Sequence, residues 1–118
     1  MLKTVKNIRK LNNAKLLVIS NDTEIKKSFE NELDEYFKEI KILPNALEAI
    51  ELASSASFDI VLIDTNLDGC SFAQACSELT QVAPTLPKII VSDDENSDDI
   101  VTAINNSAYT FTSKPLRL

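Results

Sequence analysis

Short apolar runs alternate along the chain with stretches in which apolar residues recur at helical spacing. A continuous run of a few aliphatic residues is typical of a strand buried on both faces of a sheet. Apolar residues spaced three or four apart instead form one face of an amphipathic helix. These patterns predict strands at 16–19, 38–43, 60–63, 89–91 and 109–112. They predict helices at 22–37, 45–53, 71–79 and 97–104.

The predicted elements alternate regularly between strand and helix. This order predicts an α/β fold in which five parallel strands form a doubly wound sheet, covered by helices on both faces as a three-layer sandwich. In such sheets the working site lies beyond the carboxyl ends of the strands, where the strand order reverses. We therefore expect functional residues within 20–22, 64–69, 92–93 and 113–115.

Two of the predicted helices begin with recognisable capping residues. Asn45 precedes Glu48 by three positions, and Ser71 precedes Gln74 by three positions. In that spacing the first side chain accepts a hydrogen bond from a free backbone N–H of the first turn. The sequence therefore predicts that one helix begins after Asn45 and another after Ser71.

Composition places the chain among ordinary globular domains. It has 118 residues, of which 44% are hydrophobic and 25% charged. No apolar run approaches the roughly 18 residues of a membrane span, and the first residues lack the apolar core of a secretory signal. Cys70 and Cys76 are too few for a disulfide framework. We therefore expect a cytoplasmic protein without membrane contact. The absence of histidine excludes a Ser-His-Asp triad and His-ligated zinc or haem in this chain.

Charge is distributed unevenly along the sequence. The first fifteen residues carry five basic and no acidic side chains, whereas the remainder carries seven basic and eighteen acidic ones. An acidic main body argues against nucleic acid as a direct partner, because phosphate contacts need positive charge. The basic start predicts a solvated helix or tail at 1–14 before a domain at 15–118, with a nucleic-acid or anionic-lipid contact as the alternative.

Three strand ends carry residues that are informative as an ordered set. Residues 58–69 read FDIVLIDTNLDG, residues 87–92 read PKIIVS and residues 111–115 read FTSKP. An aspartate, a hydroxyl and a Lys-Pro pair at successive strand ends resemble the receiver domain of bacterial two-component response regulators. NALEAIELA at 45–53 is similar to the second helix of that family. The resemblance covers residues 15–116 and implies a flavodoxin-like topology and a signalling role rather than an enzymatic one.

The resemblance also implies roles for individual residues. Asp64 matches the aspartate that accepts a phosphoryl group from a sensor histidine kinase or phosphotransfer protein. Ser92 matches the hydroxyl residue, and Lys114 the lysine, that contact the phosphoryl oxygens. Phe111 matches the aromatic residue whose ring position tracks activation. Asn66 matches the residue whose backbone carbonyl helps to hold Mg²⁺.

One departure from the family concerns the metal. Ser20 and Asn21 stand where the family has a pair of acidic residues that hold Mg²⁺. This ion prefers anionic oxygens, so the site offers one carboxylate, Asp64, unless Asp22 also reaches it. The neutral oxygens of Ser20 and Asn21 would bind Mg²⁺ through water and much more weakly, so we expect weakened Mg²⁺ binding. A second departure is Asp93, where the family mostly has a small residue. Its carboxylate would repel the phosphoryl group or replace a lost metal ligand.

The same residues also have structural interpretations. Asn21 with Glu24 fits a helix cap, and Asp22 would then favour the helix dipole from the first turn. Asp64 and Lys114 could form a plain buried ion pair. Gly69, the only glycine, predicts a turn with positive φ.

A further departure is at the end of the sequence. The family has a fifth helix after the Lys-Pro pair, and this chain ends at Leu118. Apolar residues recur every three positions within 2–12, which predicts a helix that covers the gap, in its own copy or in a second copy as a homodimer. The alternative is a domain cut from a larger protein with an output domain.

Three functions remain in competition. The first is a receiver that is phosphorylated at Asp64, with weakened dependence on Mg²⁺. The second is a pseudo-receiver that serves as a protein-interaction or dimerisation module without phosphorylation. The third, an unrelated α/β enzyme or nucleotide binder, is disfavoured because the chain lacks the GxGxxG and GxxxxGK[ST] phosphate-binding motifs.

Overall fold

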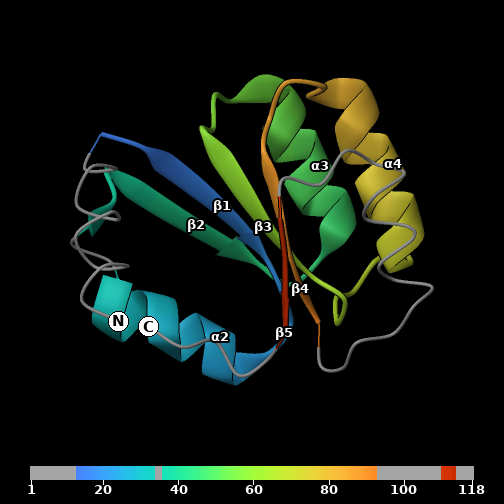
Figure 1. Cartoon of the computed structure of the whole chain (residues 1–118). Coiled ribbons are helices and arrows are strands. Elements are labelled where there is room, and N and C mark those ends of the chain that lie inside the picture. Colours follow the sequence, from blue (N-terminus) through green and yellow to red (C-terminus); the bar gives the residue numbers. More distant parts are fainter. Residues whose placement is uncertain (1–12, 34–35, 93–109, 114–118) are drawn as a thin grey trace.

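A computed structural model of the chain describes residues 13–33, 36–92 and 110–113. Strands and helices alternate from residue 15 to residue 92 (Figure 1). The elements in chain order are β1 (Lys15–Ile19), α2 (Thr23–Ser28), the π-helical turn η1 (Phe29–Leu33), β2 (Glu39–Leu43), α3 (Ala46–Ser55), β3 (Ile60–Asp64), α4 (Phe72–Val82), β4 (Lys88–Ser92) and β5 (Thr110–Ser113). None of the helices in the described parts is long and apolar enough to cross a membrane.

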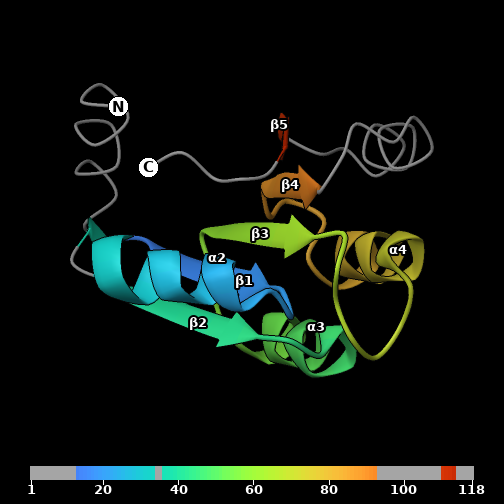
Figure 2. The same cartoon turned by 90° about the horizontal axis from the view of Figure 1, so that it is seen from below.

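The five strands form one parallel sheet in the order β2-β1-β3-β4-β5 (Figure 2). Helix α2 covers one face of the sheet, and α3 and α4 cover the other (Figure 1). This arrangement confirms the predicted doubly wound, three-layer fold. After β1 the chain adds β2 on one side of β1, and it then adds β3, β4 and β5 on the other side of β1. The strand order therefore reverses between β1 and β3.

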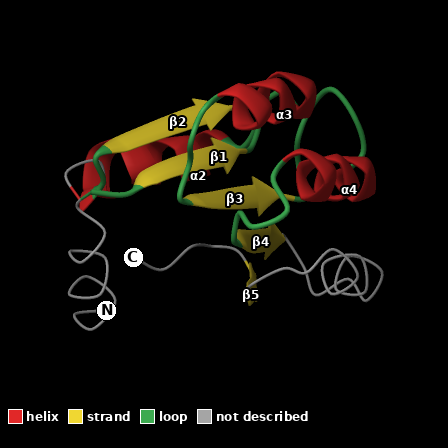
Figure 3. Cartoon of the chain, turned by 90° about the horizontal axis from the view of Figure 1, so that it is seen from above, coloured by secondary structure: helices red, strands yellow, loops and turns green. Residues whose placement is uncertain are grey.

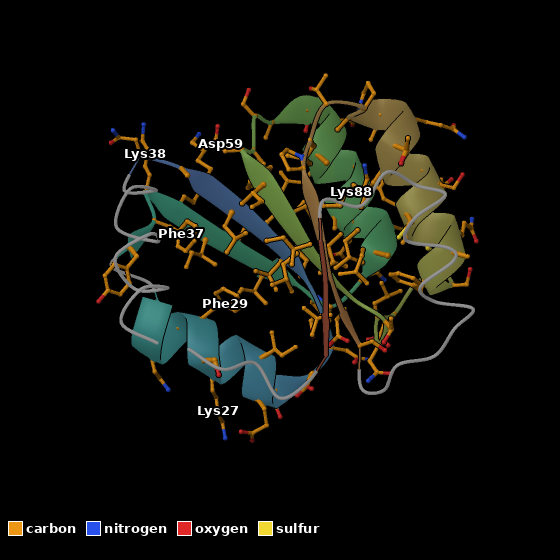
Figure 4. All side chains as sticks on the ribbon, viewed as in Figure 1. Lys27, Phe29, Phe37, Lys38, Asp59 and Lys88 are labelled. Carbon is orange, nitrogen blue, oxygen red and sulfur yellow. The ribbon has the colours of Figure 1, made fainter. Side chains whose placement is uncertain are left out.

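Successive residues of the central strands contribute to two different cores. Leu17 and Ile19 of β1 face α3 and α4, whereas Leu16 and Val18 face α2. All four side chains are buried, because helices cover both faces of a parallel sheet. This explains why the strand reads as a continuous apolar run rather than an alternating one. Phe29 lies between α2 and the sheet, as Figure 4 shows.

The first helix differs from its prediction. The sequence predicts one α-helix over 22–37, but α2 ends at Ser28 and the chain continues as a π-helical turn. The apolar residues Ile25, Phe29 and Leu33 are spaced four apart, which exceeds the α-helical repeat, so each would drift by about 40° around a regular helix. A π turn, with its i→i+5 hydrogen bonds, has more residues per turn than an α-helix.

Two predicted helix caps are confirmed and one is wrong. Asn45 Oδ1 accepts hydrogen bonds from the backbone N–H groups of Leu47 and Glu48, at 2.9 and 3.3 Å. Ser71 Oγ accepts a hydrogen bond from the Gln74 N–H at 3.1 Å.

For α2 the predicted cap was Asn21, but the N-cap is Asp22, whose Oδ1 accepts from the Glu24 N–H at 2.9 Å. The Asn21 side chain is used elsewhere, as described below.

Lys88 is a buried lysine at the start of β4. Its side chain is 1% exposed and lies on the side of the sheet that α3 and α4 cover (Figure 4). Burial lowers the pKa of its ammonium group, and the nearby Cys76 thiol partly opposes this shift.

Several predictions lie outside the described residues. They are residues 1–12 of the predicted basic segment with its helix at 2–12, Asp93, the helix at 97–104, and the end of the chain from Lys114 onward. The prediction that the fifth helix is absent or replaced also concerns this last part. The fifth strand is present as Thr110–Ser113, one residue later than predicted.

Candidate functional site

The candidate site lies at the carboxyl ends of β1, β3 and β4. Ser20 directly follows β1, Asp64 ends β3 and Ser92 ends β4. These three side chains are 4%, 0% and 1% exposed, which is unusual for polar residues. Since parallel strands end at the same edge of a sheet, the fold brings together residues that are far apart in the sequence. The buried polar edge coincides with the point where strand order reverses.

Both carboxylate oxygens of Asp64 accept hydrogen bonds from nearby protein groups. The Ser20 hydroxyl donates to Asp64 Oδ2 at 2.6 Å, and the Asn66 backbone N–H donates to Asp64 Oδ1 at 3.0 Å. Hydrogen bonds to a charged acceptor are shorter and stronger than neutral ones. The buried carboxylate is therefore held in one orientation by a donor on each oxygen.

Ser20 is itself fixed by the backbone that follows it. Its Oγ accepts a hydrogen bond from the Asp22 N–H at 3.0 Å while its hydroxyl proton points to Asp64. The backbone N–H of Ser20 donates to the carbonyl of Leu43, at 3.1 Å, which continues the pairing of β1 with β2. Ser20 thus joins the end of β1, the start of α2 and the acceptor carboxylate.

The loop after Asp64 is attached to two neighbouring loops. The Asn66 carbonyl accepts from the Asn21 N–H at 3.1 Å, and the Asn21 side-chain amide donates to Asp68 Oδ1 at 3.2 Å. The Asp68 carbonyl accepts from the Ala46 N–H at 2.7 Å. Figure 3 shows this loop between β3 and α4, beside the connection from β2 to α3.

Gly69 completes this loop with a φ of +96°, which confirms the predicted turn.

The metal ligands implied by the resemblance do not form a Mg²⁺ site in the described residues. The Asn66 carbonyl receives the Asn21 N–H, and Asp22 Oδ1 caps α2. No three Asp, Glu, Cys or His side chains gather as a metal site within 13–33, 36–92 and 110–113. Mg²⁺ needs several hard, mostly anionic oxygens, and the Ser20 hydroxyl is neutral. The residues described here therefore do not fit the ion.

The remaining predicted residues are only partly placed. Ser92 is opposite Ser113 in the pairing of β4 with β5, and Phe111 is opposite Ile90. The side chain of Phe111, like Lys114 and Asp93, lies outside what the structure describes. The Thr65 N–H donates to the Val91 carbonyl at 2.9 Å, so the loop after Asp64 begins beside β4.

A cavity of about 200 Å³ adjoins the site on the α2 side. Ser20, Asn21, Asp22 and Lys26 contribute its polar wall. Lys26 and Ile42 also line a second cavity, of about 310 Å³, between α2 and β2.

Cys70 is part-buried just before α4, and burial is the main cause that raises the pKa of its thiol, with a smaller effect from Glu78.

The hydrogen bond from Ser20 to Asp64 was not predicted from the sequence. Ser20 was expected to lie near the site, at a position where the family has an acidic residue. The available signal was the doubly wound order, which makes β1 and β3 neighbours and brings their carboxyl ends together. The contact between Asn21 and Asp68 was also missed.

Solved structures with the same fold include proteins described as receiver domains or response regulators. A receiver domain protein (CheY-like) from Methanospirillum hungatei JF-1 superposes with a TM-score of 0.81, at 22% identity, covering 89% of this chain and 84% of that one. A two-component response regulator from Clostridium difficile gives 0.79 at 23% identity, covering 89% and 86%. At this identity the likeness establishes the fold.

Two curated relatives are described as regulators. The probable transcriptional regulator ycf29 of Porphyra purpurea is 26% identical over 103 residues, which cover 85% of this chain and 49% of the relative. The nisin biosynthesis regulatory protein NisR of Lactococcus lactis subsp. lactis is 23% identical, covering 88% and 45%. The chain spans about half the length of these relatives.

The family match agrees with the fold and with the strand-end residues. The sequence pattern of the response regulator receiver domain matches residues 3–118, nearly the whole chain. This chain belongs to the response regulator receiver domain family.

Proposed function

We propose that this receiver domain accepts a phosphoryl group on Asp64. The observation that supports the proposal is the buried carboxylate at the end of β3, held by Ser20 and by the Asn66 N–H. A carboxylate fixed in one orientation loses less freedom when it meets a phosphorus atom in line. Ser92, at the end of the neighbouring strand, is in this proposal the hydroxyl that turns toward the phosphoryl oxygens.

The proposed transfer makes Asp64 the nucleophile. One of its carboxylate oxygens forms a bond to phosphorus, while the phosphorus–nitrogen bond to a phosphorylated histidine of the donor breaks. That histidine takes up a proton, and the product is a mixed anhydride. Negative charge on the transferring oxygens needs a cation, a role that we assign to Lys114. Phe111 in β5 is the proposed aromatic switch.

The proposed partners follow from the family. The donor is a sensor histidine kinase or a phosphotransfer protein in the cytoplasm. The domain passes the signal on to an output domain, a partner protein or a second copy of this chain. The residues from 15 to 118 form the receiver unit in this proposal, and 1–14 form a basic segment before it. The acidic body makes direct contact with nucleic acid unfavourable.

The test is the intact mass of the protein after incubation with a small-molecule phosphodonor such as acetyl phosphate. We expect one added phosphoryl group in the unmodified chain and none in Asp64→Asn. The matched control is Asp59→Asn, because Asp59 lies at the opposite edge of the sheet, where its Oδ2 accepts from the Lys15 N–H (Figure 4). This control should be labelled like the unmodified chain.

Two results would contradict the proposal. One is the absence of any added phosphoryl group under conditions that label an ordinary receiver domain, which would favour the protein-interaction module. The other is equal labelling of Asp64→Asn, which would place the modification on a different residue.

A further inference from the structure

The oxygens around Asp64 already have protein donors. Asp64 Oδ1 accepts from the Asn66 N–H, and Asp64 Oδ2 accepts from the Ser20 hydroxyl. The Asn66 carbonyl accepts from the Asn21 N–H. In a metal site these oxygens would instead face a cation, and their charge would be balanced by it. Here each of these oxygens already accepts a hydrogen bond from the protein.

Charge supports the same conclusion. Asp22 uses Oδ1 to cap α2, and Asp68 uses Oδ1 to hold the Asn21 amide. Asp64 is therefore the one carboxylate of the described residues that faces Ser20 within hydrogen-bond distance. Removing bound water from Mg²⁺ is costly in free energy. The interaction with a single carboxylate and a neutral hydroxyl does not offset this cost.

We propose that Ser20 replaces a divalent cation as the group that positions Asp64, so that the site operates without Mg²⁺. This proposal rests on the proposed function, because it concerns the same carboxylate. Ser20 is a positioning residue, since it acts through Asp64. Its orientation is fixed, because the Asp22 N–H occupies its acceptor side and leaves the hydroxyl proton for Asp64.

The first arm of the test is binding of Mg²⁺ alone. Backbone amide spectra of the unmodified chain are recorded during a titration with MgCl₂. We expect no saturating shift of the Ser20, Asp64 or Asn66 amides up to about 10 mM, because Asp64 is the one carboxylate that the described residues bring to Ser20. Saturation below about 1 mM would overturn the proposal, since a site of that affinity must have hard ligands available.

The second arm restores the missing charge. Ser20→Asp adds a carboxylate beside Asp64, and Asn21→Asp adds one at the exposed neighbouring position, which serves if the first variant does not fold. We expect at least one of them to bind Mg²⁺ about tenfold more tightly than the unmodified chain. If neither gains affinity, the local charge is not what excludes the cation, and the proposal fails.

The third arm separates positioning from general stability. The labelling rate with the phosphodonor is measured in EDTA and in MgCl₂, and the readout is the ratio of the two rates. We expect a ratio near one for the unmodified chain. Ser20→Ala should be about tenfold slower in both conditions, and Ser20→Thr, which keeps the hydroxyl, should recover most of the rate. The control Ser54→Ala removes an exposed hydroxyl that only bonds the Glu51 carbonyl, and it should change nothing.

The arms distinguish the two proposals. Labelling of Asp64 that requires Mg²⁺ would keep the proposed function and overturn this inference. Equal rates for Ser20→Ala and the unmodified chain would also overturn it. If no labelling occurs in either condition, the proposed function fails, and the Mg²⁺ titration alone then supports or overturns the inference.

Discussion

Gly69 lies directly against the side chain of Asn45. A β-carbon placed on Gly69 would be 2.5 Å from Asn45 Oδ1 and 3.3 Å from the Ala46 backbone nitrogen. The same Asn45 oxygen caps α3. The loop after Asp64 and the start of α3 are therefore packed so closely that only glycine fits between them.

Gly69→Ala should destabilise the fold. The φ of +96° is unfavourable for any residue with a β-carbon, and the new methyl group would displace the Asn45 side chain. We expect a loss of about 1–3 kcal/mol in the free energy of unfolding. Urea denaturation followed by circular dichroism measures it.

A double-mutant cycle separates the two causes. Asn45→Ala alone should cost about 1 kcal/mol through the lost cap. In that background Gly69→Ala should cost less than in the unmodified chain, because the side-chain clash is gone and only the backbone strain remains. Equal costs in both backgrounds would mean that the contact with Asn45 contributes nothing.

Much of the fold could be predicted because the central strands β1, β3 and β4 are buried on both faces. The run at 16–19 becomes β1, and the run at 60–63 becomes β3 with Asp64 added. The caps at Asn45 and Ser71 were predictable because they depend only on local spacing. The end of α2 was not, because the apolar spacing indicated one α-helix over 22–37, and the π turn at Phe29–Leu33 begins within that range.

Asp22→Ala should destabilise the start of α2. Asp22 Oδ1 accepts from the Glu24 N–H, and alanine would leave this donor without its partner. We expect a loss of about 1 kcal/mol in the free energy of unfolding.

Asp22→Asn keeps an acceptor oxygen, so its free energy of unfolding should fall by only about a few tenths of a kcal/mol. Asn21→Ala, which removes an exposed hydrogen bond to Asp68, should also have a small effect. A larger loss for Asn21→Ala than for Asp22→Ala would contradict the assignment of the cap. The same urea titrations measure all three variants.

Lys88→Met should stabilise the fold at neutral pH. The folded state buries the lysine side chain, and burial lowers the pKa of its ammonium group, so the charged form is disfavoured in the folded chain. Methionine has a similar shape without the charge. We expect a gain of roughly 0.5–1 kcal/mol in the free energy of unfolding.

The pH dependence gives an independent check on Lys88. With a lowered pKa in the folded state, the unfolded chain binds the proton more tightly. The contribution of Lys88 to stability therefore rises as the pH increases from its pKa in the folded chain to the ordinary lysine value. Lys88→Met should lack this rise, and Lys27→Met, at an exposed lysine of α2 that points away from the sheet (Figure 4), should keep it.

The two cysteines should differ in reactivity. Cys76 is fully buried and Cys70 is part-buried, so a thiol reagent should modify Cys70 first in the folded protein. Because burial raises the pKa of the Cys70 thiol, its rate at mildly alkaline pH should be below that of a cysteine in a short unstructured peptide. Absorbance with an aromatic disulfide reagent measures the rate, and Cys70→Ser should abolish the first phase. First modification of Cys76 would contradict the expectation.

The candidate site was predictable in its position but not in its contacts. Asp64 and Ser92 end buried runs, which the sequence shows directly. The contact between Ser20 and Asp64 joins residues 44 positions apart, and it exists because β1 and β3 are neighbours in the sheet. Local spacing carries no information on such a pair. The absence of the acidic pair could be seen in the sequence, whereas the hydrogen bond from the Ser20 hydroxyl to Asp64 could be seen only in the fold.

The hydrogen bond from the Ala46 N–H to the Asp68 carbonyl, at 2.7 Å, gives the domain a built-in spectroscopic reporter. The frequency of an amide proton depends on the length of its hydrogen bond, and this amide is bonded to the loop that begins at Asp64. We therefore expect the proposed phosphorylation of Asp64 to shift the Ala46 amide signal, at the first residue of α3 and outside the groups that take part in the transfer.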